Sequence, residues 1–145
     1  MKKLTISFLL LLFTVISVPL HAQPDAHDKL KKQINEMVEN VQEAETAIEK
    51  RTILNHSFDD LMTAFNRVSA MDRVPMSDKE AIADFKNTIQ EKKDELNGTN
   101  GYEKVPDSQL DEFADYVQQD IEQADRAITI SLTTALLIII ILLLL

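Results

Sequence analysis

Apolar residues recur every three or four positions between residues 25 and 128, a spacing that predicts amphipathic helices. The first stripe predicts a helix over residues 25–51 and consists of Leu30, Ile34, Met37, Val41, Ala44 and Ile48. The stripe is interrupted after Arg51, so we expect a break near residues 52–56. Ser57 and Asp60 then suit a helix start, because a hydroxyl accepts from a free backbone N–H and a carboxylate favours the positive helix end. The alternative is an extended first helix in a three-helix domain.

Three further helices are expected over residues 57–71, 77–96 and 108–126. The residues expected to face inward from the first two are Phe58, Leu61, Met62, Phe65, Val68, Ile82, Phe85, Ile89 and Leu96. The 57–71 helix stops before Pro75, and Ser77 with Glu80 forms a capping-box sequence for the next helix. That helix ends at Asn97-Gly98, where the sequence predicts an exposed, mobile loop up to Pro106.

The last predicted helix starts at Asp107 or Ser108, and no helix-breaking residue lies between Phe113 and Leu145. Its apolar stripe is Leu110, Phe113, Val117, Ile121, Ala124 and Ile128. The pattern therefore predicts one helix of more than thirty residues that runs from the folded domain straight into the C-terminal tail.

The tail, residues 127–145, carries no charge over its 19 residues. As a helix it would reach about 28 Å, close to the thickness of the hydrocarbon core of a bilayer. We therefore expect a single transmembrane anchor. A buried core helix is the alternative, but residues 138–145 are apolar on every helical face. A GPI signal is disfavoured because Asp125-Arg126-Ala127 provides no polar spacer.

The N-terminus has the form of a secretory signal. Lys2 and Lys3 precede an apolar stretch over residues 4–18, and Pro19 and Ala22 suit cleavage that leaves Gln23 as the first mature residue. The segment resembles Gram-negative bacterial export signals, a resemblance of targeting and not of family. Leu20 three residues before the cleavage site leaves an uncleaved signal anchor as the alternative. We expect an ectodomain over residues 23–126, on the exported side of the membrane.

The chain has 145 residues and lacks cysteine, and it contains only two glycines and four prolines. This composition predicts an all-α fold, a small up-down bundle of four or possibly three helices without disulfides. Loss of Lys2 and Lys3 with the signal changes the net charge from −9 to −11. Such an acidic domain would repel nucleic acid.

No catalytic, metal or cofactor residue is assigned from the sequence. The histidines are His21, His27 and His56, and no Glu-x-x-His pair supports a metal site in the bundle. Seven acidic residues lie between Asp107 and Asp125 and are interpreted as a solvated helix face. Asn55 and Asn97 begin N-glycosylation sequons, which matter only in a eukaryotic source.

These features predict a membrane-anchored, exported helical protein with a non-enzymatic role in protein interaction or envelope scaffolding. The alternative function is a bundle that binds a small ligand or cofactor. The expected location is the periplasmic face of an inner membrane or, in a eukaryote, the cell surface or secretory pathway. Ala127, Ser131 and Ala135 form a small-residue ridge through which two tails could associate.

Overall fold

The computed structural model describes residues 26–127 and 130–145, and these residues form an all-α structure without strands. The predicted signal and its cleavage site lie outside the described residues. The elements are α2 (Ala26–Glu43), α3 (Ala47–Ser69), α4 (Met76–Asn97), the 3-10 helix η1 (Asp107–Gln109), α5 (Leu110–Ala127) and α6 (Leu132–Leu144). The all-α prediction is confirmed. The helix count is not, because these residues form five α-helices and not three or four.

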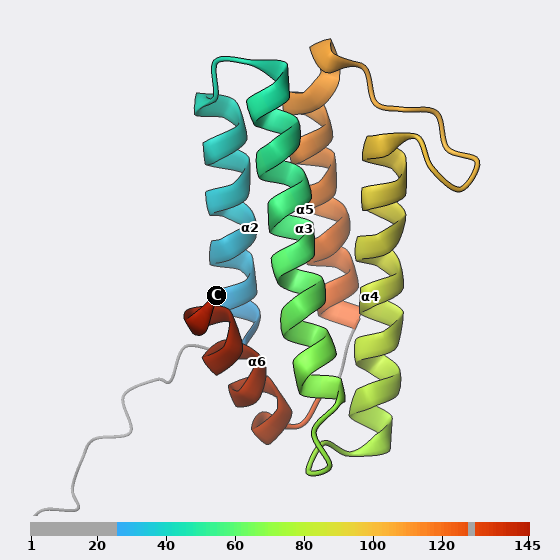
Figure 1. Ribbon diagram of the computed structural model, residues 1–145. Coiled ribbons are helices and arrows are strands. Elements are labelled where there is room, and N and C mark those ends of the chain that lie inside the picture. The colour runs from blue at the N-terminus through green and yellow to red at the C-terminus, as the bar shows by residue number, and fades with distance from the viewer. Residues whose placement is uncertain (1–25, 128–129) are drawn as a thin grey trace, which may run out of the picture.

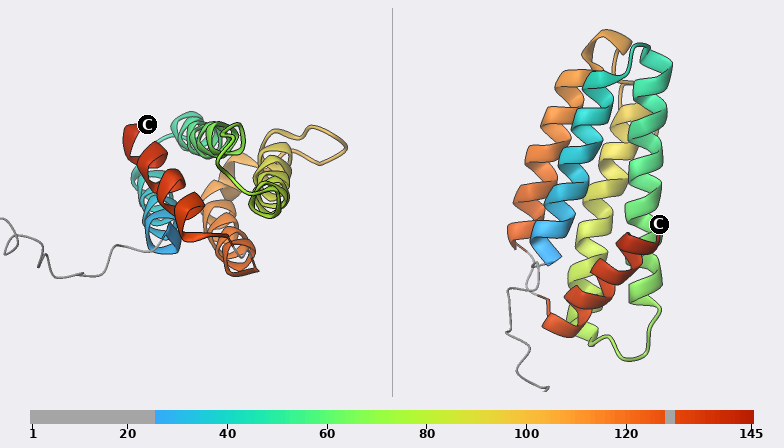
Figure 2. Two further views of the ribbon diagram at one scale, coloured as in Figure 1. Left: turned by 90° about the horizontal axis from the view of Figure 1, so that it is seen from below. Right: turned by 90° about the vertical axis from the view of Figure 1, so that its left-hand side faces the viewer.

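Helices α2 to α5 stand side by side in alternating directions as an up-down bundle (Figure 1). Each of these helices packs against its neighbour in sequence, and α5 closes the bundle against α2. The fifth helix, α6, crosses the outside of α2 and α3 near one end of the bundle (Figure 2). The bundle therefore has two different ends, one carrying α6 and one carrying the long loop between α4 and α5.

The apolar stripes of the four bundle helices meet in one core. Its fully buried members include Ile34, Val41, Leu54, Phe58, Val68, Ile82, Phe85, Ile89, Leu96, Leu110, Val117 and Ile121. Phe65 and Phe85 pack with their ring centroids 4.9 Å apart. Their contact joins α3 to α4 at the centre of the bundle. The inward positions expected for α3, α4 and α5 are confirmed up to Ala124, with Met62 and Ala124 only partly buried, and Ile128 lies outside the described residues.

The first helix break lies at residues 44–46, so the predicted break at 52–56 is wrong. Thr46 is the N-cap of α3, and its hydroxyl accepts a hydrogen bond from the backbone N–H of Glu49 at 3.2 Å. Ile48, which was expected to face inward, is 81% exposed. Ser57 and Asp60 lie in the middle of α3 and not at a helix start. The short turn reverses the chain early because the cap at Thr46 begins a new helix.

Two alanine substitutions test whether α3 begins at Thr46 or at Ser57. Thr46→Ala removes the acceptor for the Glu49 N–H and should lower the free energy of unfolding by about 1 kcal/mol. Ser57→Ala, at the position where the sequence had suggested a cap, should change it by less than about 0.5 kcal/mol. Urea denaturation measures both. Equal losses in the two variants would contradict the observed boundary.

Helix α4 has the predicted boundaries within one residue at each end, but its start is not a capping box. Pro75 occupies the N-cap position and makes no side-chain cap, whereas Ser77 donates to Asp78 at 3.5 Å. The predicted end is confirmed, because Gly98 has a φ of 69°. A Cβ atom there would come within 2.7 Å of the Lys104 side chain. Glycine is therefore required where the loop folds back on itself.

The loop after α4 is exposed over residues 99–104, as expected, and side chains near both of its ends bond to it. The carboxylate of Asp94 accepts hydrogen bonds from the side chains of Thr99 and Asn100, each at 2.8 Å. These bonds, first that from Asn100, hold the pKa of Asp94 below its usual value. Arg51 of α3 donates to the carbonyls of Leu96 and Val105.

The largest correction concerns the tail. Helix α5 ends at Ala127 and a separate helix begins at Leu132, so the predicted single helix of more than thirty residues is wrong. Ser131 caps α6, and the chain turns back so that Ile138, Ile141 and Leu142 join the bundle core. Apolar burial on α2 and α3 accounts for this reversal. Among the described residues, no helix has both the length and the apolar character needed to cross a membrane.

Candidate functional site

Helix α6 has one side packed on the bundle and one side open. The packed side chains are Thr134, Ala135, Ile138, Ile139, Ile141 and Leu142. The open side comprises Ile140, Leu143, Leu144 and the chain end Leu145, which are 52%, 66%, 74% and 48% exposed. We call these four residues the outer face of α6. They make up half of the eight large apolar side chains exposed in the described part of the chain.

Asp78, in the first turn of α4, fastens the start of α6 to the bundle. Its Oδ2 atom accepts hydrogen bonds from the Ser131 N–H at 3.1 Å and from the hydroxyls of Ser131 and Thr134 at 2.6 Å each. Asp78 is only 5% exposed, and its carboxylate has no cationic partner among the described residues. The hydrogen bonds, first that from the Ser131 side chain, hold the pKa of Asp78 below its ordinary value. The role of Asp78 was not predicted from the sequence, because an aspartate in the first turn of a helix is common and its partners Ser131 and Thr134 lie far away in the chain.

The other end of α6 meets the first turns of α2. There the side chain of Gln33 donates to the carbonyl of Leu142 at 3.4 Å. A cavity of about 80 Å³ at this meeting point is lined by Lys29, Lys32, Gln33, Glu36, Ile139, Leu142 and Leu143. Lys32 pairs with Glu36 at 3.4 Å, whereas Lys29 forms no ion pair with another described residue. Two lysines thus lie directly beside the outer face of α6.

Charge is unequally divided between the two ends of the bundle. When each bundle helix is divided at its midpoint, the half that carries α6 comprises residues 26–34, 59–86 and 119–127. That half has ten acidic and eight basic side chains, a net charge of −2. The other half, residues 35–58 and 87–118, has thirteen acidic and five basic side chains, a net charge of −8. Helix α6 therefore packs on the nearly neutral half of the molecule, and its last turn reaches Gln33 and Glu36 at the middle of α2.

The acidic residues of α5 and its approach do more than form the solvated face expected from the sequence. Asp111 pairs with Lys50, and Asp107 pairs with Arg51 at 2.7 Å. Asp120 pairs at 2.8 Å with Lys92, whose side chain is 2% exposed. The run thus joins α5 to α3 and α4. The sequence could not reveal these pairs because they connect residues far apart in the chain.

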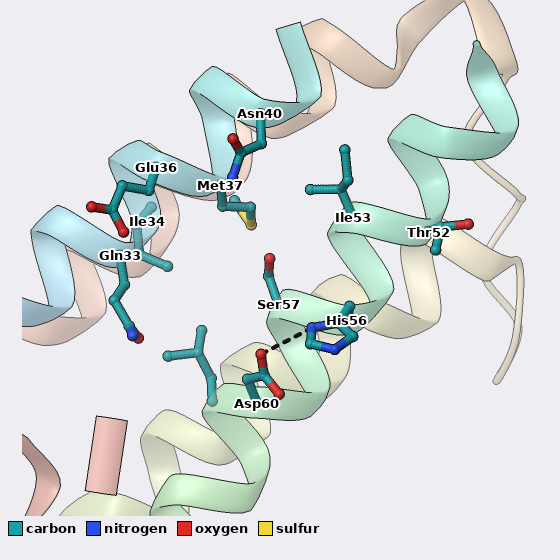
Figure 3. A pocket seen from close by; sticks show the side chains of 11 residues that line it. Gln33, Ile34, Glu36, Met37, Asn40, Thr52, Ile53, His56, Ser57 and Asp60 are labelled. Atoms are coloured by element: carbon teal, nitrogen blue, oxygen red, sulfur yellow. Dashed lines mark ion pairs between the residues drawn. The ribbon is translucent and has the colours of Figure 1, made fainter. Parts of the chain in front are cut away.

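A groove of about 460 Å³ opens between α2 and α3 (Figure 3). Its walls combine apolar side chains such as Met37 with polar ones such as Asn40 and Ser57. His56 pairs with Asp60 through Nδ1 at 2.9 Å, along one helix. Within residues 26–127 and 130–145, no cluster of three or more His, Cys, Asp or Glu side chains could hold a metal ion. The groove opens at the surface of the bundle, and its lining includes the core residues Ile34, Met37 and Leu61.

The two sequon asparagines lie side by side and bond to each other. The side-chain amide of Asn97 donates to Asn55 at 2.8 Å, and that of Asn55 donates to Asn97 at 3.3 Å. Both amides also donate to backbone carbonyls of their own helices. A glycan on either nitrogen would break this pair between α3 and α4.

The predicted ridge of small residues is divided between two helices. Ala127 ends α5, whereas Ser131 caps α6 and Ala135 is buried within it. With α6 docked on the bundle, these residues do not form one continuous face.

Comparison with protein-family models, with curated proteins and with solved structures gave no match for this chain.

Proposed function

We propose that this protein is an exported helical bundle that is attached to a membrane through its C-terminal apolar segment and serves a non-enzymatic role in protein interaction or envelope scaffolding. The observation that carries the proposal is the polarity of the bundle. One half carries α6 with its outer face and has little net charge, and the other half has most of the negative charge. Exposed apolar patches rimmed by polar residues are typical of interaction surfaces.

Export is inferred from the N-terminal signal sequence, and attachment from the uncharged segment 127–145. An exported protein attached in this way stays on the outer side of the membrane that it has crossed. In a Gram-negative cell this is the periplasmic face of the inner membrane. In a eukaryote it is the cell surface or the lumen of the secretory pathway.

The acidic half of the bundle is the end that we assign to a protein partner. Its net charge of −8 attracts basic surfaces and accelerates their encounter. The salt bridges of Lys50 and Arg51 stiffen this end, so that it presents a preformed surface. A rigid, preformed surface suits a scaffolding role.

The arrangement of the tail in the bilayer has two alternatives. The 13-residue helix α6 is about 20 Å long, shorter than the roughly 30 Å of hydrocarbon that a span must cross. A single span would require α6 to leave the bundle and to join the residues before it in a longer helix. A surface attachment leaves α6 where it is.

Removal of residues 128–145 tests the proposed attachment. The exported full-length protein should fractionate with membranes, whereas the shortened protein should remain helical and appear in the soluble exported fraction. A photocrosslinker at Glu45, in the acidic half, should capture a specific partner, and one at Lys79, at the other end, should not. Membrane association that survives the deletion would contradict attachment through α6. Equal capture at both positions, or no capture in the native membrane, would contradict the interaction role.

A further inference from the structure

We infer that the protein binds the surface of an anionic bilayer with α6 still docked on the bundle, using the outer face of α6 and the adjacent Lys29 and Lys32. This inference rests on the proposed membrane attachment and specifies its geometry. The tail then lies in the interface between water and lipid and does not span the membrane.

The shape of α6 suits a helix that lies in the membrane surface. Interfacial helices bury an apolar side about 5–10 Å deep and keep a polar side toward water. From Ala135 onward helix α6 is apolar on every face, and the bundle supplies the missing polar side by covering Ile138, Ile141 and Leu142. The outer face is left for the lipid, and Leu144 is its most exposed member at 74%.

Charge complementarity predicts that the bound lipid has an anionic headgroup. Lys29 and Lys32 lie beside Leu143, so both ammonium groups can reach headgroups when the outer face is buried in lipid. Basic residues next to an apolar anchor are attracted by anionic headgroups over about a Debye length. The half with a net charge of −8 is repelled by the same headgroups and turned away. Both effects turn the half that carries α6 toward the membrane.

Release of α6 is opposed by the contacts at its start. Asp78 would lose its three hydrogen bonds to Ser131 and Thr134 and would keep only the 3.5 Å bond from Ser77. The apolar seat on α2 and α3 would also become exposed to water. Surface binding needs neither change.

A disulfide lock separates surface binding from spanning. The chain has no cysteine, and the Asp78 carboxylate touches the Ser131 hydroxyl at 2.6 Å, so Asp78→Cys with Ser131→Cys can fix α6 to the bundle. The exported protein carrying this pair is oxidised or reduced and floated with vesicles of phosphatidylglycerol and phosphatidylcholine. Oxidised and reduced protein should bind equally. Because Asp78→Cys also removes the hydrogen bonds that fasten α6, a pair of thiols that does not oxidise is joined instead by a short bismaleimide. Failure of both the disulfide and the bismaleimide link would contradict the docked position of α6.

The other outcomes distinguish surface binding by docked α6 from membrane attachment through the tail in general. Binding only after reduction would mean that α6 must leave the bundle, which overturns the surface geometry and leaves membrane attachment intact. No binding in either state would contradict the attachment itself. Equal binding to vesicles of phosphatidylcholine alone would overturn the role of the lysines.

Matched substitutions test the two parts of the surface. Leu144→Gln should weaken vesicle binding by about 10- to 100-fold because a leucine is no longer buried in lipid. Ile48→Gln removes a similarly exposed apolar residue from the opposite end, where Ile48 is 81% exposed, and should leave binding unchanged. Equal losses would show that binding has no preferred end.

The lysine pair has its own control. Lys29→Gln with Lys32→Gln should weaken binding to the anionic vesicles by roughly 5- to 30-fold. Lys93→Gln with Lys104→Gln changes the net charge equally but lies in the half of the bundle that does not carry α6, and should have a much smaller effect. A loss of the same size in both pairs would overturn the assigned surface and leave only a response to total charge.

Discussion

Lys92→Met is expected to lower the free energy of unfolding by about 3 kcal/mol or more, because removing one partner from a buried ion pair leaves the other without compensation. The Lys92 side chain is 2% exposed and lies within 2.8 Å of Asp120 and 3.0 Å of Glu95. It also donates to the hydroxyl of Tyr116 at 2.6 Å and lies 4.3 Å from the centre of that ring. Burial alone would lower the pKa of Lys92, but its bonds to Asp120, Tyr116 and Glu95 raise it above the ordinary value.

The neighbouring lysine provides the control for this measurement. Lys93 pairs with Asp59, and their side chains are 30% and 59% exposed. Lys93→Met should therefore cost about 1 kcal/mol or less in a urea titration. If Lys92→Met costs no more than Lys93→Met, the buried ion pair does not hold α4 to α5.

Asp78→Ala is expected to loosen α6 while the four-helix bundle remains folded. The substitution removes three hydrogen bonds to one carboxylate oxygen and leaves the fully buried hydroxyl of Thr134 with a poorer partner. Hydrogen bonds to charged groups contribute more than neutral ones, and the total cost should be about 2–4 kcal/mol. Amide hydrogen exchange in residues 132–144 should become roughly 30- to 1,000-fold faster, with little change in α3 and α4.

A control substitution and the response to acid test whether the Asp78 carboxylate itself fastens α6. Asp84→Ala removes an exposed carboxylate from the same helix and should leave exchange in α6 unchanged. Because the pKa of Asp78 is lowered in the folded protein, its contribution is present above the ordinary value of 3.8 and is lost as the pH falls further. Acid should therefore loosen α6 in the natural protein and have less effect in Asp78→Ala. Identical acid responses in both proteins would show that this carboxylate does not fasten the helix.

The sequence predicted the core of the bundle well because helical periodicity directly reports which residues face inward. Phe58, Phe85 and Val117 were all placed correctly by spacing alone, and each is buried. Gly98 was also identified correctly, since few residues other than glycine accept its backbone conformation.

The first helix boundary failed because two local signals competed. The apolar stripe continued through Ile48 in sequence, but Thr46 with Glu49 three residues later supplied a helix start that ended the stripe. Ile48 thus continues a periodic pattern without belonging to the core. Where apolar spacing continues past the end of a helix, the capping residue marks the boundary better than the spacing does.

The tail could not be resolved from its composition. Uncharged apolar residues suit lipid and a protein core equally, and helix continuity across residues 128–131 was assumed because no proline or glycine interrupts it. The decisive contact is Asp78 with Ser131, which are 53 positions apart. Periodicity carries no information about such a pair. The sequence therefore predicted that the tail is apolar. It did not predict that Lys29 and Lys32 lie beside the tail or that Asp78 fastens it to the bundle.

Binding through α6 would bury the two halves of the bundle to different depths in a membrane. A fluorophore is attached to Leu144→Cys, on the outer face of α6, or to Glu45→Cys, at the opposite end, in the otherwise cysteine-free protein. Each protein is mixed with anionic vesicles that contain brominated lipids, which quench fluorophores buried among the acyl chains. We expect strong quenching at position 144 and none at position 45. Equal quenching at both positions, or quenching at position 45 alone, would contradict binding through α6.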